Sequence, residues 1–318
     1  MSNAITERQL SPPKKTNNST LMRRLIKNKY IYFMILPGLL YFLVFKYIPM
    51  WGLIISFQDY QPYKGVLGSE WVGFEHFHRL FTEDMFWTIF KNTLILFFIN
   101  VLFYFPVPII LALMLNEVRK VFFQRTIQTL VYIPHFMSWV IVVSISFVML
   151  TMDGGIINEL LVYFGFNKVN FLLNPDWFRP MYVIQVIWRE AGWGTIIYLA
   201  AIAAIDPQLY EAARMDGAGR FRQMWHITLP AIRSVIIVLL ILKIGDIMEL
   251  SFEHVYLLLN SMNREVAEIF DTYVYTAGLR QGQYSFSTAV GFFKSFVGLV
   301  LVMLANWLSK KFGEEGIY

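Results

Sequence analysis

Residues 206–234 read DPQLYEAARMDGAGRFRQMWHITLPAIRS and form a polar stretch between two long apolar runs. Asp206 can accept hydrogen bonds from the exposed backbone N–H groups of a helix N-terminus, and Pro207 stands in the first turn, where its missing N–H costs no hydrogen bond. We therefore predict a short helix from about Pro207. Its apolar face follows the helical spacing i, i+3, i+4 and consists of Leu209, Ala212 and Ala213.

A second short helix is predicted directly after the first. Gly217 and Gly219 supply the left-handed stop of the first helix. The same apolar spacing then returns in Phe221, Met224 and Trp225. Pro230 is expected to restart the chain as a membrane span. Two small helices joined in this way at a membrane surface are typical of a docking element.

The composition predicts an integral membrane protein. Hydrophobic residues make up 57% of the 318 residues and charged residues only 15%, which leaves too little polar surface for a soluble domain. The apolar runs match the ~20 residues of a membrane-crossing helix and not the ~10 alternating residues of a barrel strand. The net charge of +5 is what cytoplasmic membrane loops produce, so no nucleic-acid partner is predicted. The absence of cysteine excludes disulfides and thiolate zinc sites.

We predict an all-α membrane domain over residues 30–310, with basic residues 1–29 and residues 311–318 as cytoplasmic tails. The domain contains six predicted spans, at about 31–57, 86–115, 126–150, 181–204, 231–258 and 286–308. With the N-terminus inside, sixteen basic residues lie in inner segments and six in outer loops. This asymmetry places both termini and the hairpin in the cytoplasm.

The spacing within the hairpin is similar to a known family motif. The pattern is E-A-A, three residues, Gly, nine residues and I-x-L-P, and it is met by Glu211, Ala212, Ala213, Gly217, Ile227, Leu229 and Pro230. It resembles the EAA loop of type I ABC importer permeases. The D-G-A form at Asp216 and the aromatic Phe221 and Trp225 look most like the sugar permeases related to the maltose system. Ser234 departs from relatives that carry a second proline there.

Two further segments resemble one branch of these sugar permeases. Residues 36–62, LPGLLYFLVFKYIPMWGLIISFQDYQP, and residues 131–140, VYIPHFMSWV, are similar to the branch that takes oligosaccharides derived from polysaccharides. The resemblance covers essentially the whole chain. It implies the type I importer permease fold, with six transmembrane helices and a cytoplasmic coupling hairpin at 206–230, between spans four and five.

The resemblance also implies partners. In this family the hairpin lies in a groove of a cytoplasmic ATPase, which closes on ATP and moves the spans. The chain has no G-x-x-x-x-G-K-[ST] loop, so ATP and Mg²⁺ are expected on two copies of a separate ATPase, with no cofactor and no catalysis in this chain. A second related permease, with a heterodimer favoured, an extracytoplasmic solute-binding protein and the lipid of a bacterial cytoplasmic membrane complete the expected partners. The alternative role of the hairpin is to cover the inner ends of neighbouring helices.

Polar residues inside predicted spans are candidates for a substrate path. In span five they recur at three- and four-residue steps, which predicts one helical face, and they are Lys243, Asp246, Glu249 and Glu253. A Lys243–Asp246 ion pair that fixes packing is the alternative. Span four offers amide, charged and aromatic groups that suit a sugar, namely Gln185, Trp188, Arg189, Glu190 and Trp193. The two tryptophans are equally consistent with an interfacial belt.

Four cations in or near the spans suit an acidic sugar such as a uronate oligosaccharide, and they are Lys46, Arg189, Lys243 and Lys294. His135 follows Pro134 and is expected to serve helix bending or packing, and His226 is expected on the docking surface. Two other functions stay open at this point. A secondary transporter accounts for the intramembrane charges but needs no hairpin, and an intramembrane enzyme needs a nucleophile and base that these residues do not form.

Overall fold

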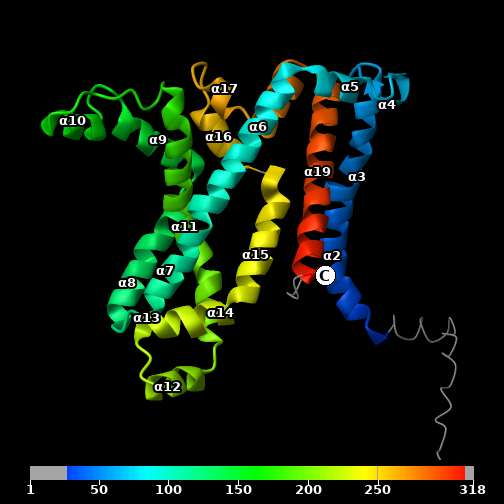
Figure 1. Cartoon of the computed structure of the whole chain (residues 1–318). Coiled ribbons are helices and arrows are strands. Elements are labelled where there is room, and N and C mark those ends of the chain that lie inside the picture. Colours follow the sequence, from blue (N-terminus) through cyan, green and yellow to red (C-terminus); the bar gives the residue numbers. More distant parts are fainter. Residues whose placement is uncertain (1–26, 249, 312–318) are drawn as a thin grey trace, which may run out of the picture. The chain divides into compact units, whose positions relative to one another are not determined.

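The computed structural model describes residues 27–248 and 250–311, and most of them are helical (Figure 1). The predicted tails lie almost entirely outside these residues, and Glu249 lies outside them too. The chain divides into two compact units, Met1–Ile54 and Ile55–Tyr318. Each unit is described by itself.

The first unit holds one apolar helix. It begins with α2 (Lys29–Phe42), passes through the π-helical turn η1 (Leu43–Tyr47) and continues as α3 (Ile48–Met50). Apolar side chains surround the helix on all sides, which suits lipid rather than water. Lys46 lies within η1.

Three π-helical turns in the chain end two residues before a proline. η1 ends at Tyr47 before Pro49, η3 (Asn100–Tyr104) ends before Pro106, and η6 (Met224–Thr228) ends before Pro230. A proline lacks the N–H that continues the helix, and its ring clashes with the carbonyl four residues earlier. The wider π turn accommodates that ring without ending the helix.

The second unit opens with a compact connector over residues 55–83. Its bounds are η2 (Trp51–Phe57, which begins in the first unit), β1 (Gln58–Asp59), α4 (Gly65–Gly68), β2 (Glu70–Trp71) and α5 (Glu75–Thr82). β1 and β2 pair antiparallel, with Gln58 opposite Trp71 and Asp59 opposite Glu70. This two-residue ladder is the one β-sheet that the described residues contain.

Two long helices of the second unit are candidate membrane spans. α6 (Asp84–Ile99), η3 and α7 (Pro106–Asn116) form one continuous helix of 33 residues, and α19 (Tyr284–Lys311) has 28 residues. With Lys29–Phe57, three helices among the described residues are long and apolar enough to cross a membrane. Three bent pairs also qualify if each counts as one span, namely Val121–Phe136 with Trp139–Leu150, Pro175–Ala203 with Pro207–Met215, and Arg220–Ala231 with Arg233–Met248.

The predicted third span is not one straight helix. α8 (Val121–Tyr132) runs into the 3₁₀ turn η4 (Ile133–Phe136), and α9 (Trp139–Leu150) starts in a new direction, with a bend of 100°. Pro134 tightens the end of the first helix, and Ser138 caps the second by accepting a hydrogen bond from Ile141 N at 3.3 Å. The span predicted at 126–150 thus corresponds to a bent pair of helices, and the bend lies beside Pro134 and His135, where helix bending was expected.

The predicted fifth span is also interrupted. α15 (Arg233–Gly245) is followed by the 3₁₀ turn η7 (Asp246–Met248), and α16 (Phe252–Leu258) is a separate helix. Lys243, Asp246 and Glu253 therefore lie on three different elements, and the predicted single helical face does not exist. Gly245 permits the close packing of α15 on α19, because a Cβ there would meet Val302 at 2.7 Å.

The remaining helices connect these spans. They are α10 (Ile156–Tyr163), η5 (Pro175–Trp177), α11 (Phe178–Ala203), α12 (Pro207–Met215), α13 (Arg220–Gln223), α14 (Leu229–Ala231), α17 (Arg264–Ala267), α18 (Phe270–Val274) and η8 (Tyr275–Arg280). In Figure 1, α12 lies at one end of the second unit, and α17 lies with the start of α6 at the other.

α11 is the central helix of the second unit and packs against α7, α8 and η4. Its interior glycines let neighbouring backbones approach closely. A Cβ on Gly192 would lie 2.0 Å from the carbonyl oxygen of Val131 in α8, and a Cβ on Gly194 would lie 3.0 Å from the ring of Pro108 in α7. Small residues at such contacts let helices pack tightly in a membrane.

We predict that Gly192→Ala separates α8 from α11 and destabilises the protein by about 1–3 kcal/mol, the usual cost of overpacking. The clash cannot be removed by a rotamer change, because the atom that the new Cβ meets is a backbone carbonyl oxygen. Gly291→Ala is the matched control, since a Cβ at this α19 position meets nothing within 4 Å. Thermal unfolding in detergent should show a lower Tm for Gly192→Ala only. Equal Tm values for the two variants would show that the close approach does not matter for stability.

Candidate functional site

The ends of α12 are fixed by its own sequence. Asp206 accepts a hydrogen bond from Gln208 N at 2.9 Å, and Pro207 begins the helix. At the other end Gly217 has a φ of +77°. Gly217 N donates to Arg214 O at 3.0 Å, and the next N–H donates to Ala213 O at 2.8 Å. These two bonds form a Schellman motif, which satisfies the last carbonyls of the helix.

The second half of the hairpin runs from α13 through η6 to α14. Gly219 is the extended N-cap of α13, with a φ of −69°, and so does not share the left-handed turn predicted for it. The chain restarts as α15 after Ile232, which has φ −92° and ψ 5°, and not at Pro230. Two side-chain bonds hold the hairpin together. Tyr210 Oη and Thr228 Oγ1 are 2.9 Å apart, and Gln223 Nε2 donates to Ala218 O at 2.7 Å.

Large apolar side chains on this hairpin remain uncovered. Exposed fractions are 51% for Leu209, 89% for Met215, 73% for Phe221 and 59% for Trp225. Glu211, Ala212, Asp216, Gly217 and Pro230 are exposed as well, whereas Ala213, Met224, Ile227 and Leu229 are half-buried. Contiguous exposed apolar side chains mark interaction surfaces. The hairpin therefore presents an apolar surface for a partner, while part of its motif packs inward.

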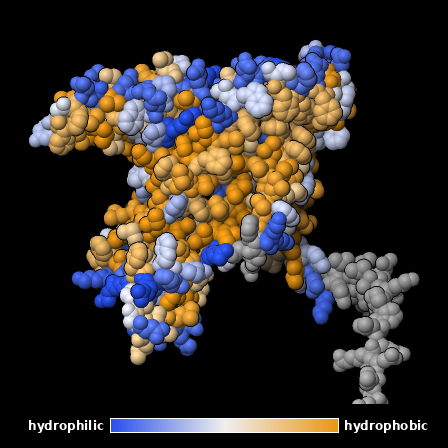
Figure 2. All heavy atoms as spheres, in the orientation of Figure 1, coloured by the Kyte–Doolittle hydropathy of each residue, from blue (hydrophilic) through white to orange (hydrophobic). Residues whose placement is uncertain are grey.

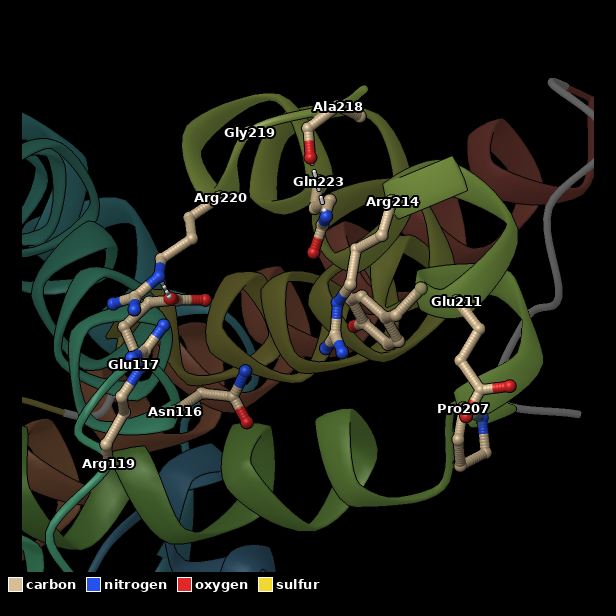
Figure 3. Close-up of a pocket in the computed structure, with 11 residues that line it drawn as sticks. Asn116, Glu117, Arg119, Pro207, Glu211, Arg214, Ala218, Gly219, Arg220 and Gln223 are labelled. Carbon is tan, nitrogen blue, oxygen red and sulfur yellow. Dashed lines mark hydrogen bonds and ion pairs between the residues drawn. The ribbon is translucent and has the colours of Figure 1, made fainter. Parts of the chain in front are cut away.

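A groove with a volume of about 760 Å³ lies beside α12. It is bounded by α12, by residues 218–223 and by the α7–α8 linker (Figure 3). Arg220 Nε is 3.9 Å from a carboxylate oxygen of Glu117. Arg214 projects from α12 into the groove, and Arg119 lies at the linker side. These two have no ion-pair partner within residues 27–248 and 250–311, so the groove suits acidic groups of a partner.

Most of the predicted path residues of α11 lie in one polar cluster at the bend between η4 and α9. Arg189 Nε donates to Met137 O at 2.8 Å, and its guanidinium lies 4.5 Å from the ring centroid of Trp139 and is paired with Glu190. The other carboxylate oxygen of Glu190 is 2.9 Å from His135 Nδ1. The guanidinium is thus fixed by a carboxylate and an aromatic face.

Aromatic rings complete this polar cluster. Trp193 stacks on His135 with ring centroids 4.5 Å apart, and its exposed fraction is 47%. Trp188 is 45% exposed on another side of the helix. His135 therefore does pack at the bend, and it also makes a hydrogen bond with Glu190. Gln185 is buried and bonds to Ser146 Oγ at 2.8 Å.

The other predicted path residues are spread over the second unit. The ammonium of Lys243 lies 5.7 Å from the ring of Tyr104. Lys294 Nζ is 2.5 Å from Asp271 Oδ1, so this cation is neutralised by an acid that the sequence did not single out. Asp246 and Glu253 are exposed. The four path residues lie on α15, α19, η7 and α16, and of these α16 reaches the cluster on α11 through His254, whose Nε2 is 2.6 Å from Gln185 Oε1.

His254 is a buried residue that sequence reasoning missed. Its ring lies between Trp139, at 3.8 Å, and Tyr182, at 4.8 Å, and its Nε2 is 2.6 Å from Gln185 Oε1. The stack joins α9, α11 and α16. Its one available signal was a histidine within an otherwise apolar run, because α16 was expected to continue the fifth span.

Comparisons with known proteins identify the family. The model of the family described as "Binding-protein-dependent transport system inner membrane component" matches residues 104–314. The chain is 73% identical to the polygalacturonan/rhamnogalacturonan transport system permease protein YteP of Bacillus subtilis (strain 168), over 96% of this chain and 95% of that protein. It is 58% identical to protein LplB of the same organism, over 93% of each.

Solved structures agree with these sequence relatives. A chain of a bacterial ABC transporter involved in the import of the acidic polysaccharide alginate has a TM-score of 0.86 and 42% identity, and the match covers 92% of this chain and 99% of that chain. The bacterial alginate ABC transporter in complex with its alginate pentasaccharide-bound periplasmic protein has a TM-score of 0.87 and 41% identity, over 93% and 99%. The fold is thus the permease fold of that importer.

We predict that Gly217→Ala strains the hairpin locally, because the left-handed conformation costs a residue with a Cβ about 1–2 kcal/mol. Gly219→Ala is the matched control, since Gly219 has a negative φ and neither site has a neighbour within 4 Å of the added Cβ. Hydrogen exchange over residues 206–231 should be about tenfold faster in Gly217→Ala and nearly unchanged in Gly219→Ala. Equal protection in both variants would contradict the assigned turn.

Proposed function

The chain belongs to the family of binding-protein-dependent transport system inner membrane components, and from this membership we propose how it works as the permease subunit of an ATP-driven ABC importer. It is a non-catalytic subunit, as are its relatives. ATP and Mg²⁺ are bound by separate ATPase subunits. The tasks of this chain are to dock the ATPase, to conduct the substrate and to receive it from outside.

The substrate class is an oligosaccharide from an acidic polysaccharide. The relatives named for polygalacturonan/rhamnogalacturonan and for alginate support this assignment, because both handle polymers that carry carboxylates. The intramembrane cations support it less than the sequence suggested. Arg189 is paired with Glu190 and Lys294 with Asp271. Of the four cations this leaves Lys243, beside a tyrosine ring, and Lys46, in η1 of the first unit.

The coupling role of the hairpin rests on one observation, which is the uncovered apolar surface of α12–α14 beside a groove with two unpaired arginines. A hairpin that only covered the inner ends of its neighbours would bury Met215, Phe221 and Trp225. A cytoplasmic ATPase that supplies an apolar cleft and acidic groups would cover this surface. The hydrogen bond between Tyr210 and Thr228 connects the two halves of the hairpin. A displacement of the hairpin by the ATPase is therefore transmitted to α11 and α15 together.

The coupling residues are those that form or shape this surface, namely Glu211, Ala212, Ala213, Asp216, Gly217, Phe221, Trp225, Ile227, Leu229 and Pro230. Within the membrane, the cluster around Gln185, Arg189 and Trp193 offers amide, cationic and aromatic groups to sugar hydroxyls and ring faces. Trp188, Lys243, Asp246, Glu249, Glu253 and Lys294 complete the proposed path.

The assembly proposed around this chain follows the importer architecture. The proposed topology has six spans, with both termini and the hairpin on the cytoplasmic side of a bacterial cytoplasmic membrane. Three long apolar helices and three bent pairs support the count, and the excess of basic residues in the inner segments supports the orientation. Two ATPase copies, a second related permease in a heterodimer and an extracytoplasmic solute-binding protein complete the complex. A periplasmic protein bound to the neighbouring alginate importer supports the last of these partners.

We expect the double substitution Phe221→Ala, Trp225→Ala to uncouple the ATPase. Each exposed aromatic that becomes a buried anchor contributes about 2 kcal/mol to binding, so the Kd for the ATPase should rise at least about 100-fold. The measurement is ATPase co-purification and substrate-stimulated ATP hydrolysis in proteoliposomes. Tyr163→Ala is the matched control, because Tyr163 is 82% exposed and lies outside the hairpin, on α10. Retained stimulation in the double variant would contradict coupling through this surface.

We expect the reconstituted complex to import trigalacturonate only when ATP and the solute-binding protein are present. The acidic assignment predicts that excess maltotriose, which carries no carboxylate, does not compete. Uptake by the permeases alone from an ion gradient would instead identify a secondary transporter. Equal uptake of maltotriose would remove the acidic preference and leave the importer assignment intact.

A further inference from the structure

A second polar groove lies at the end of the second unit opposite α12. It has a volume of about 670 Å³ and is bounded by the first turns of α6, the start of α11 and residues 261–266 around α17. Figure 1 places α17 beside the upper end of α6, with α12 at the lower end. Figure 2 shows hydrophilic residues at this upper end, above the hydrophobic middle of the unit. We name it the α6–α17 groove.

The α6–α17 groove is lined by side chains of both charges, but the one charged side chain among them that is partly buried is a cation. Lys91, Arg179 and Arg264 line it together with Asp84 and Glu265. The two acids and Lys91 are exposed to solvent, whereas Arg179 is half-buried. Solvent screens the exposed acids, so the least screened charge in the groove is that of Arg179.

Arg179 is not neutralised by the protein. Its Nη2 donates a hydrogen bond to the neutral amide oxygen of Asn92 at 3.3 Å, and its buried Nε has no hydrogen-bond partner. No carboxylate lies within ion-pair distance of it among residues 27–248 and 250–311. Removing a charged group from water without an opposite charge is costly. Its place in the first turn of α11 adds repulsion from the helix N-terminus.

The position of Arg179 is nevertheless held. Asn92 Nδ2 donates to the backbone carbonyls of Glu265, at 2.8 Å, and Glu268, at 3.2 Å, which directs its amide oxygen to the guanidinium. Glu268 is buried and lies 3.6 Å from Arg264 Nε. Burial raises the pKa of the Glu268 carboxyl, and Arg264 offsets this only in part. Glu268 is therefore paired with Arg264 and does not neutralise Arg179.

Lys91 supplies a second uncommitted cation on the same wall. It lies on the face of α6 that carries Asp84 and Thr88, at helical spacing. Its ammonium has no ion pair in the part of the chain that the structure describes. Around the two cations the groove offers the hydroxyls of Thr88 and Ser261 and the apolar edges of Met85 and Val266. Its volume falls in the ~300–1,000 Å³ range of small-molecule sites.

We propose that the α6–α17 groove is an entry site for acidic oligosaccharides, in which Arg179 and Lys91 bind the carboxylate of a uronate residue. The mixed lining favours a sugar, because hydroxyl groups and apolar side chains flank the cations and match the hydroxyls and ring faces of a sugar. A carboxylate side chain of a partner protein would use only the cations. This inference rests on the proposed function and adds to it a receiving site away from the path residues of α11. Arg179 and Lys91 are then specificity-determining residues.

The test uses the complete complex in proteoliposomes with saturating, sugar-loaded solute-binding protein. Lys91→Gln and Arg179→Gln should each lower the maximal rate of trigalacturonate import about fivefold, as expected for loss of one partly screened charge contact. Arg179→Lys should restore most of the rate. Lys64→Gln, which removes an exposed cation from the α4 loop, should leave it unchanged. The Kd of the complex for the solute-binding protein is measured in parallel and should not change.

Two results would overturn the entry site. Unchanged import in both Lys91→Gln and Arg179→Gln would show that the groove takes no carboxylate from the sugar. A Kd for the solute-binding protein that rises by the same factor as import falls would show that the groove docks that protein. Because Lys91 is exposed, its variant stays informative even if Arg179→Gln fails to fold. A wild-type complex that imports no oligosaccharide at all refutes the proposed function itself, and the entry site with it.

Discussion

Every backbone N–H and C=O within an apolar surrounding must find its hydrogen-bond partner inside the protein, and the rest of this structure depends on that constraint. The chain obeys it even where its sequence would break a helix. Pro49, Pro106 and Pro230 each follow a π-helical turn, so the helix widens and continues. Where the helix does break, at residues 137–138, the Ser138 hydroxyl caps the next helix and Arg189 binds the carbonyl of Met137. Breaks therefore occur where side chains satisfy the backbone.

The same requirement explains why polar side chains gather at the bend beside α11. A carbonyl released by the break needs a donor, and an arginine that reaches it needs a counter-charge and a ring face, which Glu190 and Trp139 provide. His254 and Gln185 extend the network to α16. The close approach of α8 at Gly192 brings η4 and its histidine within reach. A structural necessity thus places amide, charge and aromatic groups together in the proposed path.

Much of the local structure was predictable because it depends on neighbouring residues. The cap at Asp206 and the left-handed turn at Gly217 follow from side-chain and backbone chemistry within four residues. The membrane class follows from composition, and the family from a spaced motif. Helix bending was expected at Pro134 and His135, but the 100° change of direction before α9 and the break after Gly245 were not predictable, because partners distant in sequence stabilise them, and apolar periodicity is the same in a straight or a broken span. The pairing of Lys294 with Asp271 could not be predicted for the same reason, since Asp271 lies 23 residues away on another helix.

The two grooves carry unpaired arginines for different physical reasons. Arg214 and Arg119 lie in an open groove beside exposed apolar side chains, so an arriving protein surface can desolvate them together with those side chains. Arg179 is already partly desolvated, and Asn92 fixes it before any ligand arrives. Pre-desolvation of a fixed cation favours a small anion, since the cost of ordering and burying the cation is met during folding and not on binding. One end of the chain is therefore suited to a protein partner and the other to a charged solute, which is the polarity that an importer requires.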